Sequence, residues 1–231
     1  MRKILCLLLA LLWLGLPARA SADDPAEEKV IYLTFDDGPG PYTEKLLDIL
    51  DRHSVKATFF VVDTPYVSLL GEIARRGHTI GIHSASHDFA RVYAGEDAFF
   101  QDLTAMRNII RDEAGICSDL IRFPGGSSNT VSRFNPGIMK RLTKAVEEMG
   151  YVYFDWNVDS NDAGGAQTAW EVYNNVTRGC KGIRQAVVLQ HDTKGFSVEA
   201  VEWIIGWGKA NGYRFAALDE NSPTVHHNVQ N

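Results

Sequence analysis

Residues 30–35 have the sequence VIYLTF, and the residues DDGP follow directly at 36–39. A short apolar run that ends in turn residues is typical of a strand buried on both of its faces. Such strands occur in parallel sheets covered by helices, where functional residues lie at the carboxyl ends of the strands. Asp36 and Asp37 stand at that end. The stretch therefore predicts a parallel α/β fold, with these two carboxylates in its functional site.

The alternation of short apolar runs with amphipathic stretches continues along the chain. Runs of strand length occupy residues 30–35, 57–62, 79–82, 120–123, 151–156, 186–189 and 214–217. Apolar residues at helical spacing occupy residues 43–53, 68–76, 98–114, 137–149, 168–178 and 198–210. This alternation predicts one α/β domain over residues 29–220, either a (β/α) barrel or an open doubly wound sheet. The polar tail, residues 221–231, is expected to fray.

Length and composition exclude several classes of protein. The chain has 231 residues, of which 45% are hydrophobic, so it can bury a core without a disulfide or a structural metal. Its formal net charge of −6 argues against a nucleic-acid partner, because nucleic-acid binding needs a basic surface.

The first residues have the layout of a secretory signal peptide. Arg2 and Lys3 precede an apolar run over 4–16, and small residues at 18–22 provide cleavage sites of the A-x-A kind. The alternative is an uncleaved membrane anchor, but an apolar run of about 13 residues is shorter than the ~20 that a span needs. We therefore expect residues 1–22 to be removed, leaving a secreted or wall-associated protein without a stable membrane anchor.

Two cysteines lie beyond this segment, Cys117 and Cys180. Exported proteins tolerate disulfides, so the two residues form either one bridge or two separate buried thiols. The choice depends on the distance between their Cα atoms, which the sequence does not define.

Side chains that ionise or bind metals follow five of the predicted strands. They are Asp36 and Asp37, His83 and His87, Arg122, the aspartates Asp155, Asp159 and Asp162, and His191. Because the carboxyl ends of parallel strands meet at one edge of a sheet, we expect these side chains to share one site.

His83 and His87 are four residues apart, and a carboxylate from another strand would complete a set of two nitrogens and one oxygen. That set suits zinc or another divalent transition metal and leaves positions open for water and substrate. Two neighbouring carboxylates repel each other, so we expect one of Asp36 and Asp37 to bind the metal and the other to stay free as a base. The alternatives are surface histidines and a simple turn.

Arg122 and His191 stand at the ends of two other predicted strands. An inward arginine needs a carboxylate partner, which Asp36 or the 155–162 group could supply; the alternative is a surface salt bridge. His191 suits a general acid beside a base, although a lone histidine in such a place is usually structural.

The motifs occur in a fixed order. They are T-F-D-D-G-P at 34–39, H-S-x-S-H at 83–87, R-x-P-G-G at 122–126, D-x-N-D at 159–162 and L-Q-H at 189–191. In this order the chain resembles the polysaccharide deacetylases of the NodB-homology type, carbohydrate esterase family 4, over residues 29–220. The resemblance implies a distorted (β/α)7 barrel and metal-dependent removal of acetyl groups from N-acetylated sugars.

The resemblance also implies a role for each matching residue. Asp37, His83 and His87 match the metal ligands, Asp36 the catalytic base, Arg122 the arginine that positions the base, His191 the catalytic acid, Asp162 the carboxylate that orients a catalytic partner, and Leu189 the apolar wall beneath the acetyl methyl group. The implied cofactor is a divalent metal, Zn²⁺ first and Co²⁺ or another transition metal as alternatives.

The sequence departs from the family pattern at two positions. Gly125 replaces an aromatic residue, which keeps the backbone N–H expected to face the oxyanion but removes a wall. Ala163 replaces a tryptophan, so a sugar-stacking surface is either missing or supplied by Trp156 or Tyr153. This departure also leaves Asp155, Asp159 and Asp162 as alternatives for the orienting carboxylate.

The intact Asp37 favours N-acetylglucosamine units over muramic acid, and the expected substrate is an N-acetylated glycan, peptidoglycan first. The alternatives are chitin oligomers or acetylxylan as substrates, a catalytically silent glycan-binding module, and an amidase that cuts peptide stems.

Overall fold

The computed structural model describes residues 28–231, and its sheet is parallel throughout. The strands are β1 (Val30–Gly38), β2 (Thr58–Val62), β3 (Thr79–Ser84), β4 (Leu120–Ile121), β5 (Val152–Tyr153), β6 (Val158–Asp159), β7 (Gln185–His191) and β8 (Arg214–Phe215). Their order is β5-β4-β3-β2-β1-β7-β6, with β8 also paired to β1. Consecutive strands are neighbours from β1 to β5, and β7 returns to the other side of β1, which is the order of a barrel. The predicted distorted barrel is thus confirmed.

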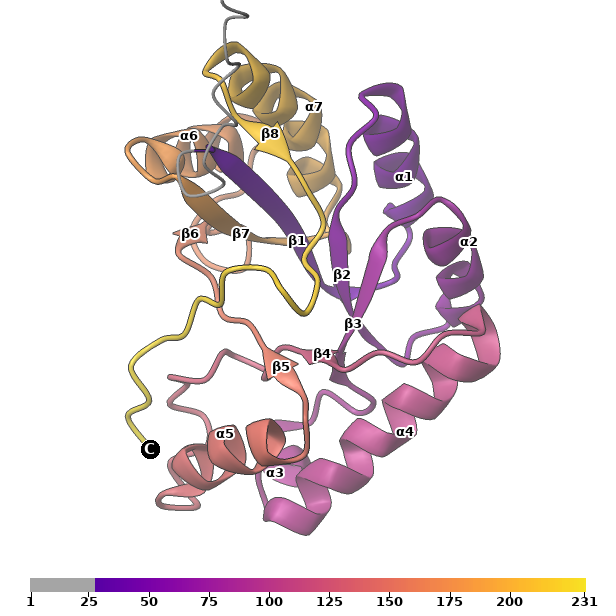
Figure 1. Ribbon diagram of the computed structural model, residues 1–231, viewed down its shortest axis with the longest axis vertical. Helices are drawn as coiled ribbons and strands as arrows, with labels where there is room; N and C mark the ends of the chain where they lie inside the picture. The colour runs from indigo at the N-terminus through magenta and orange to yellow at the C-terminus, as the bar shows by residue number, and fades with distance from the viewer. Residues whose placement is uncertain (1–27) are drawn as a thin grey trace, which may run out of the picture.

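Helices surround the curled sheet (Figure 1). They are α1 (Thr43–Arg52), α2 (Leu70–Arg75) after the 3₁₀ turn η1 (Val67–Leu69), α3 (Phe89–Val92), α4 (Glu96–Ala114), α5 (Ile138–Glu148), α6 (Ala169–Cys180) and α7 (Gly195–Ala210). Every predicted helix has a counterpart. The four-residue α3 was not predicted, because it is too short for a periodic pattern and begins at Asp88, whose side chain accepts from two backbone N–H groups.

The barrel is not closed by hydrogen bonds, because β5 pairs with β4 while β6 pairs with β7. Residues 154–157 cross this open seam between the two edges of the sheet. The predicted strand 151–156 is therefore wrong beyond Tyr153. The backbone carbonyls of Phe154 and Asp155 accept from the Arg122 guanidinium, each at 3.0 Å, instead of joining a ladder.

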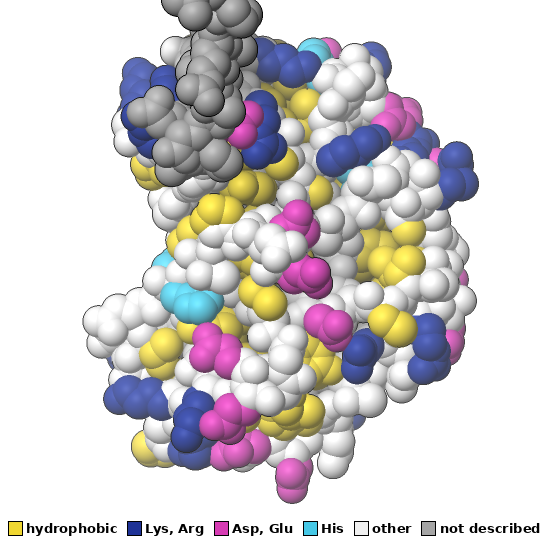
Figure 2. All heavy atoms as spheres, in the orientation of Figure 1, with side chains coloured by type: hydrophobic (Ala, Val, Ile, Leu, Met, Phe, Trp, Pro, Cys, Tyr) yellow, Lys and Arg dark blue, Asp and Glu magenta, His cyan; other side chains and the backbone are white. Residues whose placement is uncertain are grey.

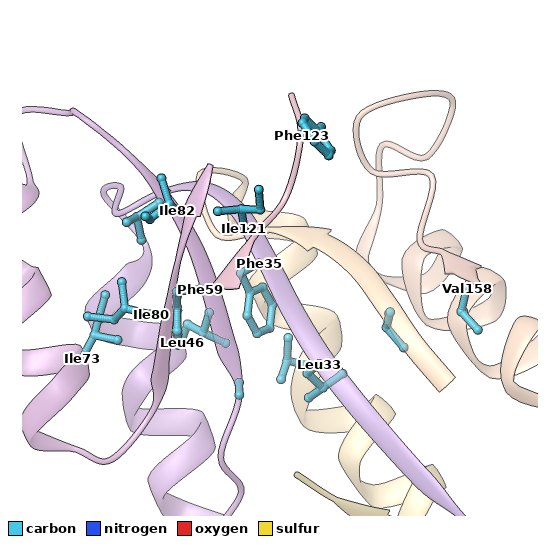
Figure 3. Packing of buried hydrophobic residues seen from close by; sticks show 14 of the residues in the cluster. Leu33, Phe35, Leu46, Phe59, Ile73, Ile80, Ile82, Ile121, Phe123 and Val158 are labelled. Atoms are coloured by element: carbon cyan, nitrogen blue, oxygen red, sulfur yellow. The ribbon is translucent and has the colours of Figure 1, made fainter. Parts of the chain in front are cut away.

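Strand β1 is buried on both faces, as its sequence predicts. Leu33 and Phe35 point outward and pack with Phe59 of β2 and Leu46 of α1 (Figure 3). Successive side chains alternate between faces, so Tyr32, Thr34 and Asp36 share the inner face. The interior of the barrel is apolar near Tyr32 and becomes polar toward the carboxyl end of the strand.

The C-terminal tail does not fray, and that expectation was wrong. The His226 ring stacks on Tyr153 with ring centroids 3.7 Å apart. The backbone N–H of His227 donates to Asp155 Oδ2 at 2.7 Å. Figure 1 shows the tail running from β8 toward α5. Residues 154–157 leave the sheet at the seam, and the tail supplies polar partners there.

Cys117 and Cys180 are separate thiols, so of the two alternatives the bridge is excluded. Only Cys180 is buried, whereas Cys117 is exposed. Burial raises the pKa of the Cys180 thiol to about 12.

The predicted signal peptide, residues 1–22, lies outside the described residues. Within 28–231, no helix is both long and apolar enough to cross a membrane. Figure 2 shows Asp and Glu side chains across the middle of one face, with most Lys and Arg nearer its rim.

Candidate active site

A cluster of metal-ligating side chains lies at the carboxyl ends of β1 and β3. Asp37 Oδ1 lies 3.4 Å from His83 Nε2 and 3.2 Å from His87 Nε2. One ligand atom from each of the three residues lies within 4.8 Å of the others. Asp37 Oδ1 is buried without a hydrogen bond from any described residue, and His83 Nδ1 donates to the Arg122 carbonyl at 2.7 Å, which leaves Nε2 facing Asp37. This donor set fits a divalent metal ion.

The protonation preferences of the cluster agree with that fit. Burial raises the pKa of Asp37, but the neighbouring imidazoles, His83 first, lower it by more. The pKa of Asp37 is therefore held below its ordinary value. Burial, together with the nearby His83, lowers the pKa of His87. Burial also lowers the pKa of His83, but Asp36 and Asp37 raise it by more. A cation at His83 Nε2 would displace that proton.

A bulge at the end of β1 brings Asp36 and Asp37 into one site. The register with β2 shifts between Asp36 and Gly38, and Asp37 has a φ of 67° in the left-handed region. Alternation alone would put the two carboxylates on opposite faces, and the bulge re-aims the second one.

The turn that carries the two histidines is held by Asp102 of α4. Asp102 accepts from Ser84 Oγ at 2.6 Å and from the backbone N–H groups of Ala85 and Ser86 at 2.8 and 2.9 Å. Burial raises the pKa of Asp102, but these hydrogen bonds lower it by more, so that the pKa lies below its ordinary value. The sequence analysis missed Asp102. Its position between Phe99 and Leu103 on the apolar face of a helix indicates a buried carboxylate that needs hydrogen-bond donors.

Asp36 is paired with Arg122 inside the barrel. Arg122 Nη1 donates to Asp36 Oδ1 at 2.8 Å and to Thr34 Oγ1 at 2.6 Å. Arg122 is only 1% exposed, and its guanidinium carbon lies 4.2 Å from the centre of the Phe60 ring, so the surface salt bridge is excluded. The second oxygen of Asp36 lies 3.9 Å from His83 Nε2.

His191 is paired with Asp162 on the other side of the pocket. Its Nδ1 lies 2.7 Å from Asp162 Oδ1, and its backbone N–H donates to Asp162 Oδ2 at 2.8 Å. Ser197 Oγ also donates to Asp162, at 2.6 Å. Burial lowers the pKa of His191, but the bond to Asp162 and the charge of that carboxylate raise it by more.

Asp162 is therefore the aspartate beside His191, and the other two candidates have different partners. Asp155 is buried and accepts from the backbone N–H of Ser127 at 2.8 Å and from that of His227. Asp159 is exposed and accepts from the backbone N–H of Asn161 at 2.7 Å.

These groups open into one pocket of about 380 Å³, whose lining includes Gly125, Leu189, Trp156 and Phe89. Trp156 thus faces the pocket, whereas Tyr153 packs on Phe123 and His226, away from it. Phe89 was missed by the sequence analysis, because α3 was not predicted.

Gly126 allows the close approach of Trp156 to the loop after β4. A Cβ at Gly126 would lie 2.9 Å from the Trp156 ring, and the backbone there has a φ of 79°. Only glycine tolerates both conditions without a shift of the loop.

Asp192 is a third residue that the sequence analysis missed, although it follows His191 directly. It is fully buried, and burial raises its pKa to about 7. Thr43 Oγ1 donates to Asp192 Oδ2 at 2.5 Å and accepts from the Gly40 backbone N–H at 2.7 Å. A side chain at Gly38 would collide with the carboxylate of Asp192. Asp192 therefore anchors the loop that follows Asp36 and Asp37.

Known proteins are similar to this chain in sequence and in fold. A family model described as polysaccharide deacetylase matches residues 23–154. A Bacillus cereus protein named peptidoglycan-N-acetylglucosamine deacetylase is 36% identical over 208 residues, which cover 85% of this chain and 71% of that protein.

Two solved structures extend the comparison. The catalytic domain of a peptidoglycan N-acetylglucosamine deacetylase from Eubacterium rectale has a TM-score of 0.87 and 51% identity, covering 90% of this chain and 100% of that chain. A Streptococcus mutans CE4 esterase has a TM-score of 0.72 and 29% identity, covering 84% and 87%. With these matches and the site above, the chain belongs to the polysaccharide deacetylase family.

Proposed function

We propose that the protein removes N-acetyl groups from N-acetylglucosamine units of peptidoglycan. The observation that carries the proposal is the arrangement around one pocket, where the Asp36–Arg122 pair and the His191–Asp162 pair flank the Asp37, His83 and His87 cluster. Hydrolysis of an amide needs a base for the attacking water and an acid for the leaving amine, and the two pairs supply them. The names of the relatives support the choice of peptidoglycan.

Asp37, His83 and His87 would hold the metal, for which we propose Zn²⁺ with Co²⁺ as the alternative. When bound, it supplies Lewis-acid polarisation of the acetyl carbonyl. Asp36 accepts a proton from the attacking water through the oxygen that Arg122 does not hold. Arg122 cannot accept that proton itself, because its guanidinium stays protonated, so it serves to orient the carboxylate.

His191 donates a proton from Nε2 to the leaving amine, while Asp162 holds Nδ1. The raised pKa of His191 favours the protonated form that this step requires. The backbone N–H of Gly125 has no acceptor among the described residues, which leaves it available to the oxyanion that forms at the carbonyl oxygen.

Leu189 and Trp156 would form the apolar parts of the substrate site, Leu189 beneath the acetyl methyl group and Trp156 beside the sugar ring. Residues 1–22 would direct export, which suits a substrate outside the cell.

The test is to incubate the zinc-loaded protein with purified peptidoglycan, chitin hexamer and acetylxylan, and to measure acetate and new free amines. We expect both products from peptidoglycan, at a rate lower by roughly 10²–10⁴ with the Asp36→Asn variant. Acetate from acetylxylan alone would reassign the substrate. New amines without acetate would indicate a peptide-stem amidase, and no product from any substrate would indicate a silent binding module.

A further inference from the structure

A second hollow adjoins the active-site pocket on the far side of the loop that follows β6. This side cleft measures about 440 Å³, and its lining includes Gly165, Ala166, Trp170, Asn174 and Arg178. Asn161 lines both the side cleft and the active-site pocket. The loop continues as Ala163 and Gly164 in the pocket and as Gly165 and Ala166 in the side cleft, so the two hollows are contiguous along it.

The loop between the two hollows carries only small side chains at residues 163–166. Residues 163–166 have the sequence AGGA, so no side chain there extends beyond a methyl group. The Asn161 carbonyl accepts from the backbone N–H groups of Gly164 and Ala166, each at 3.0 Å, and holds the loop in a compact turn. The side chain that lies against this turn is the Asn161 amide, beside Gly164 and Gly165. An extended molecule that crosses the loop would therefore meet this hydrogen-bonding amide, and no large side chain from residues 163–166.

Trp170 presents an aromatic surface at the far side of this loop. It is 62% exposed and stacks on Tyr173, with ring centroids 5.3 Å apart and an interplanar angle of 24°. It stands in the first turn of α6, which a capping box between Thr168 and Glu171 anchors. The ring is thus supported on one side by Tyr173 and by a well-defined start of its helix.

The side chains around Trp170 are polar and suited to hydroxyl and amide groups. Asn174 adds an amide, and Arg178 adds a cation one turn further along α6. A rigid aromatic face beside a few hydrogen-bonding groups suits a ligand with an apolar face and polar edges. Sugar rings have this character, because their axial C–H groups form apolar faces and their hydroxyl groups lie at the edges.

We propose that the side cleft binds further sugar units of the glycan chain whose N-acetylglucosamine unit occupies the active-site pocket, with Trp170 stacking on one of the rings. The occupant follows from continuity, since a chain of linked sugars that leaves the pocket over residues 163–166 arrives at Trp170. The inference rests on the proposed function.

The test compares N-acetylglucosamine oligomers of two to six units on the zinc-loaded full-length chain. For the unmodified protein, kcat/KM for acetate release rises with oligomer length. Trp170→Ala lowers kcat/KM for the hexamer by about tenfold through KM, because the exposed Trp170 face is covered only when a sugar stacks on it. It changes the dimer little, because the dimer does not reach Trp170.

Trp203→Ala is the matched control. Trp203 of α7 belongs to the same aromatic group, with its ring 6.3 Å from Tyr173 and 49% of its surface exposed, but it lines a different hollow beside Ile49 and Arg52. Helices α6 and α7 lie side by side (Figure 1), so both variants disturb the same packing. We expect Trp203→Ala to keep the full dependence on length.

The inference is overturned if Trp170→Ala and Trp203→Ala have the same dependence on length as the unmodified protein. Calorimetric binding of the hexamer to both variants separates this outcome from failure of the proposed function. If the unmodified protein releases no acetate but Trp170→Ala still weakens hexamer binding, the side cleft stands and the function falls. Equal hexamer affinity for all three proteins removes the side cleft whatever the activity.

Discussion

Asp36 and Asp37 are neighbours in the chain, yet the fold gives them different partners. Asp36 is held by Arg122, and Asp37 lies between the imidazoles of His83 and His87. The Asp36→Asn variant keeps the metal ligands but removes the base, so we expect kcat to fall by roughly 10²–10⁴ while zinc affinity changes little. Acetate release and zinc titration measure the two effects. Asp37→Asn is the comparison and should lose zinc; equal loss of zinc in both variants would contradict the assignment.

We expect the pairing of His191 with Asp162 to set the alkaline limit of activity. Asp162 raises the pKa of His191, so the protonated acid persists to higher pH and activity declines as the pH rises through that value. In Asp162→Asn the charge is gone, the pKa of His191 falls, and the alkaline limb of the kcat profile should move to lower pH. Rates measured from pH 5 to 10 test this, with Asp159→Asn as the control. An alkaline limb that stays in place would show that His191 does not titrate in that step.

Asp192 should make the stability of the metal-free protein depend on pH. Its pKa is raised to about 7 by burial, above the ordinary 3.8, so the folded state holds a proton that the unfolded state has lost between these values. Stability from this group is therefore present below about pH 4 and is lost as the pH rises to 7. Asp192→Asn should gain stability relative to the unmodified protein between pH 4 and 8, by up to about 4 kcal/mol. Urea unfolding in EDTA measures the difference, and a gap between the two proteins that does not change with pH would contradict the prediction.

At the scale of elements, the tail supports the part of the chain that crosses the open seam. His227 Nε2 donates to the Trp156 carbonyl at 2.7 Å, and the two rings meet edge to face at 4.7 Å. Trp156 in turn lines the active-site pocket. The tail therefore contacts a residue that lines the pocket, whereas no residue of 221–231 lines the pocket itself.

His227→Ala should loosen Trp156, raising KM for the glycan and lowering the free energy of unfolding by about 1–2 kcal/mol. His226→Ala is the control, because His226 stacks on Tyr153, which faces away from the pocket. We expect a similar loss of stability but an unchanged KM, measured by urea unfolding and by steady-state rates. A KM that rises equally in both variants would assign the effect to general unfolding of the tail.

At the scale of the whole molecule, the site lies at the strand ends and the apolar core lies below it. The core is formed by apolar side chains such as Leu33 and Phe59, and none of the three metal-ligating residues is a member of it. We therefore expect EDTA to abolish acetate release while far-ultraviolet circular dichroism stays unchanged. Zinc at 100 times its Kd should raise stability by about 2.7 kcal/mol. Loss of helical signal in EDTA would show instead that the metal holds the fold together.

Most strands and helices, and the residues at their ends, can be predicted from the amino-acid sequence; the exceptions are the short β6 and α3 and the part of strand 151–156 beyond Tyr153. Residues 30–35 predict a buried strand because the relevant pattern lies within a few neighbouring residues, and β1 has that character. The meeting of His83 and His87 with one of Asp36 and Asp37 was also predictable, because parallel strands deliver their carboxyl ends to one edge of the sheet. The choice of Asp37 came from the family resemblance.

Which of several equivalent aspartates pairs with which partner depends on the three-dimensional packing. Asp162 meets His191 across 29 positions of sequence, and Asp155 meets His227 across 72. Such pairs depend on how the sheet curls and where its seam opens, which no local periodicity encodes. The same holds for the tail, whose polar composition predicts fraying, whereas unpaired groups at the seam provide the partners that order it.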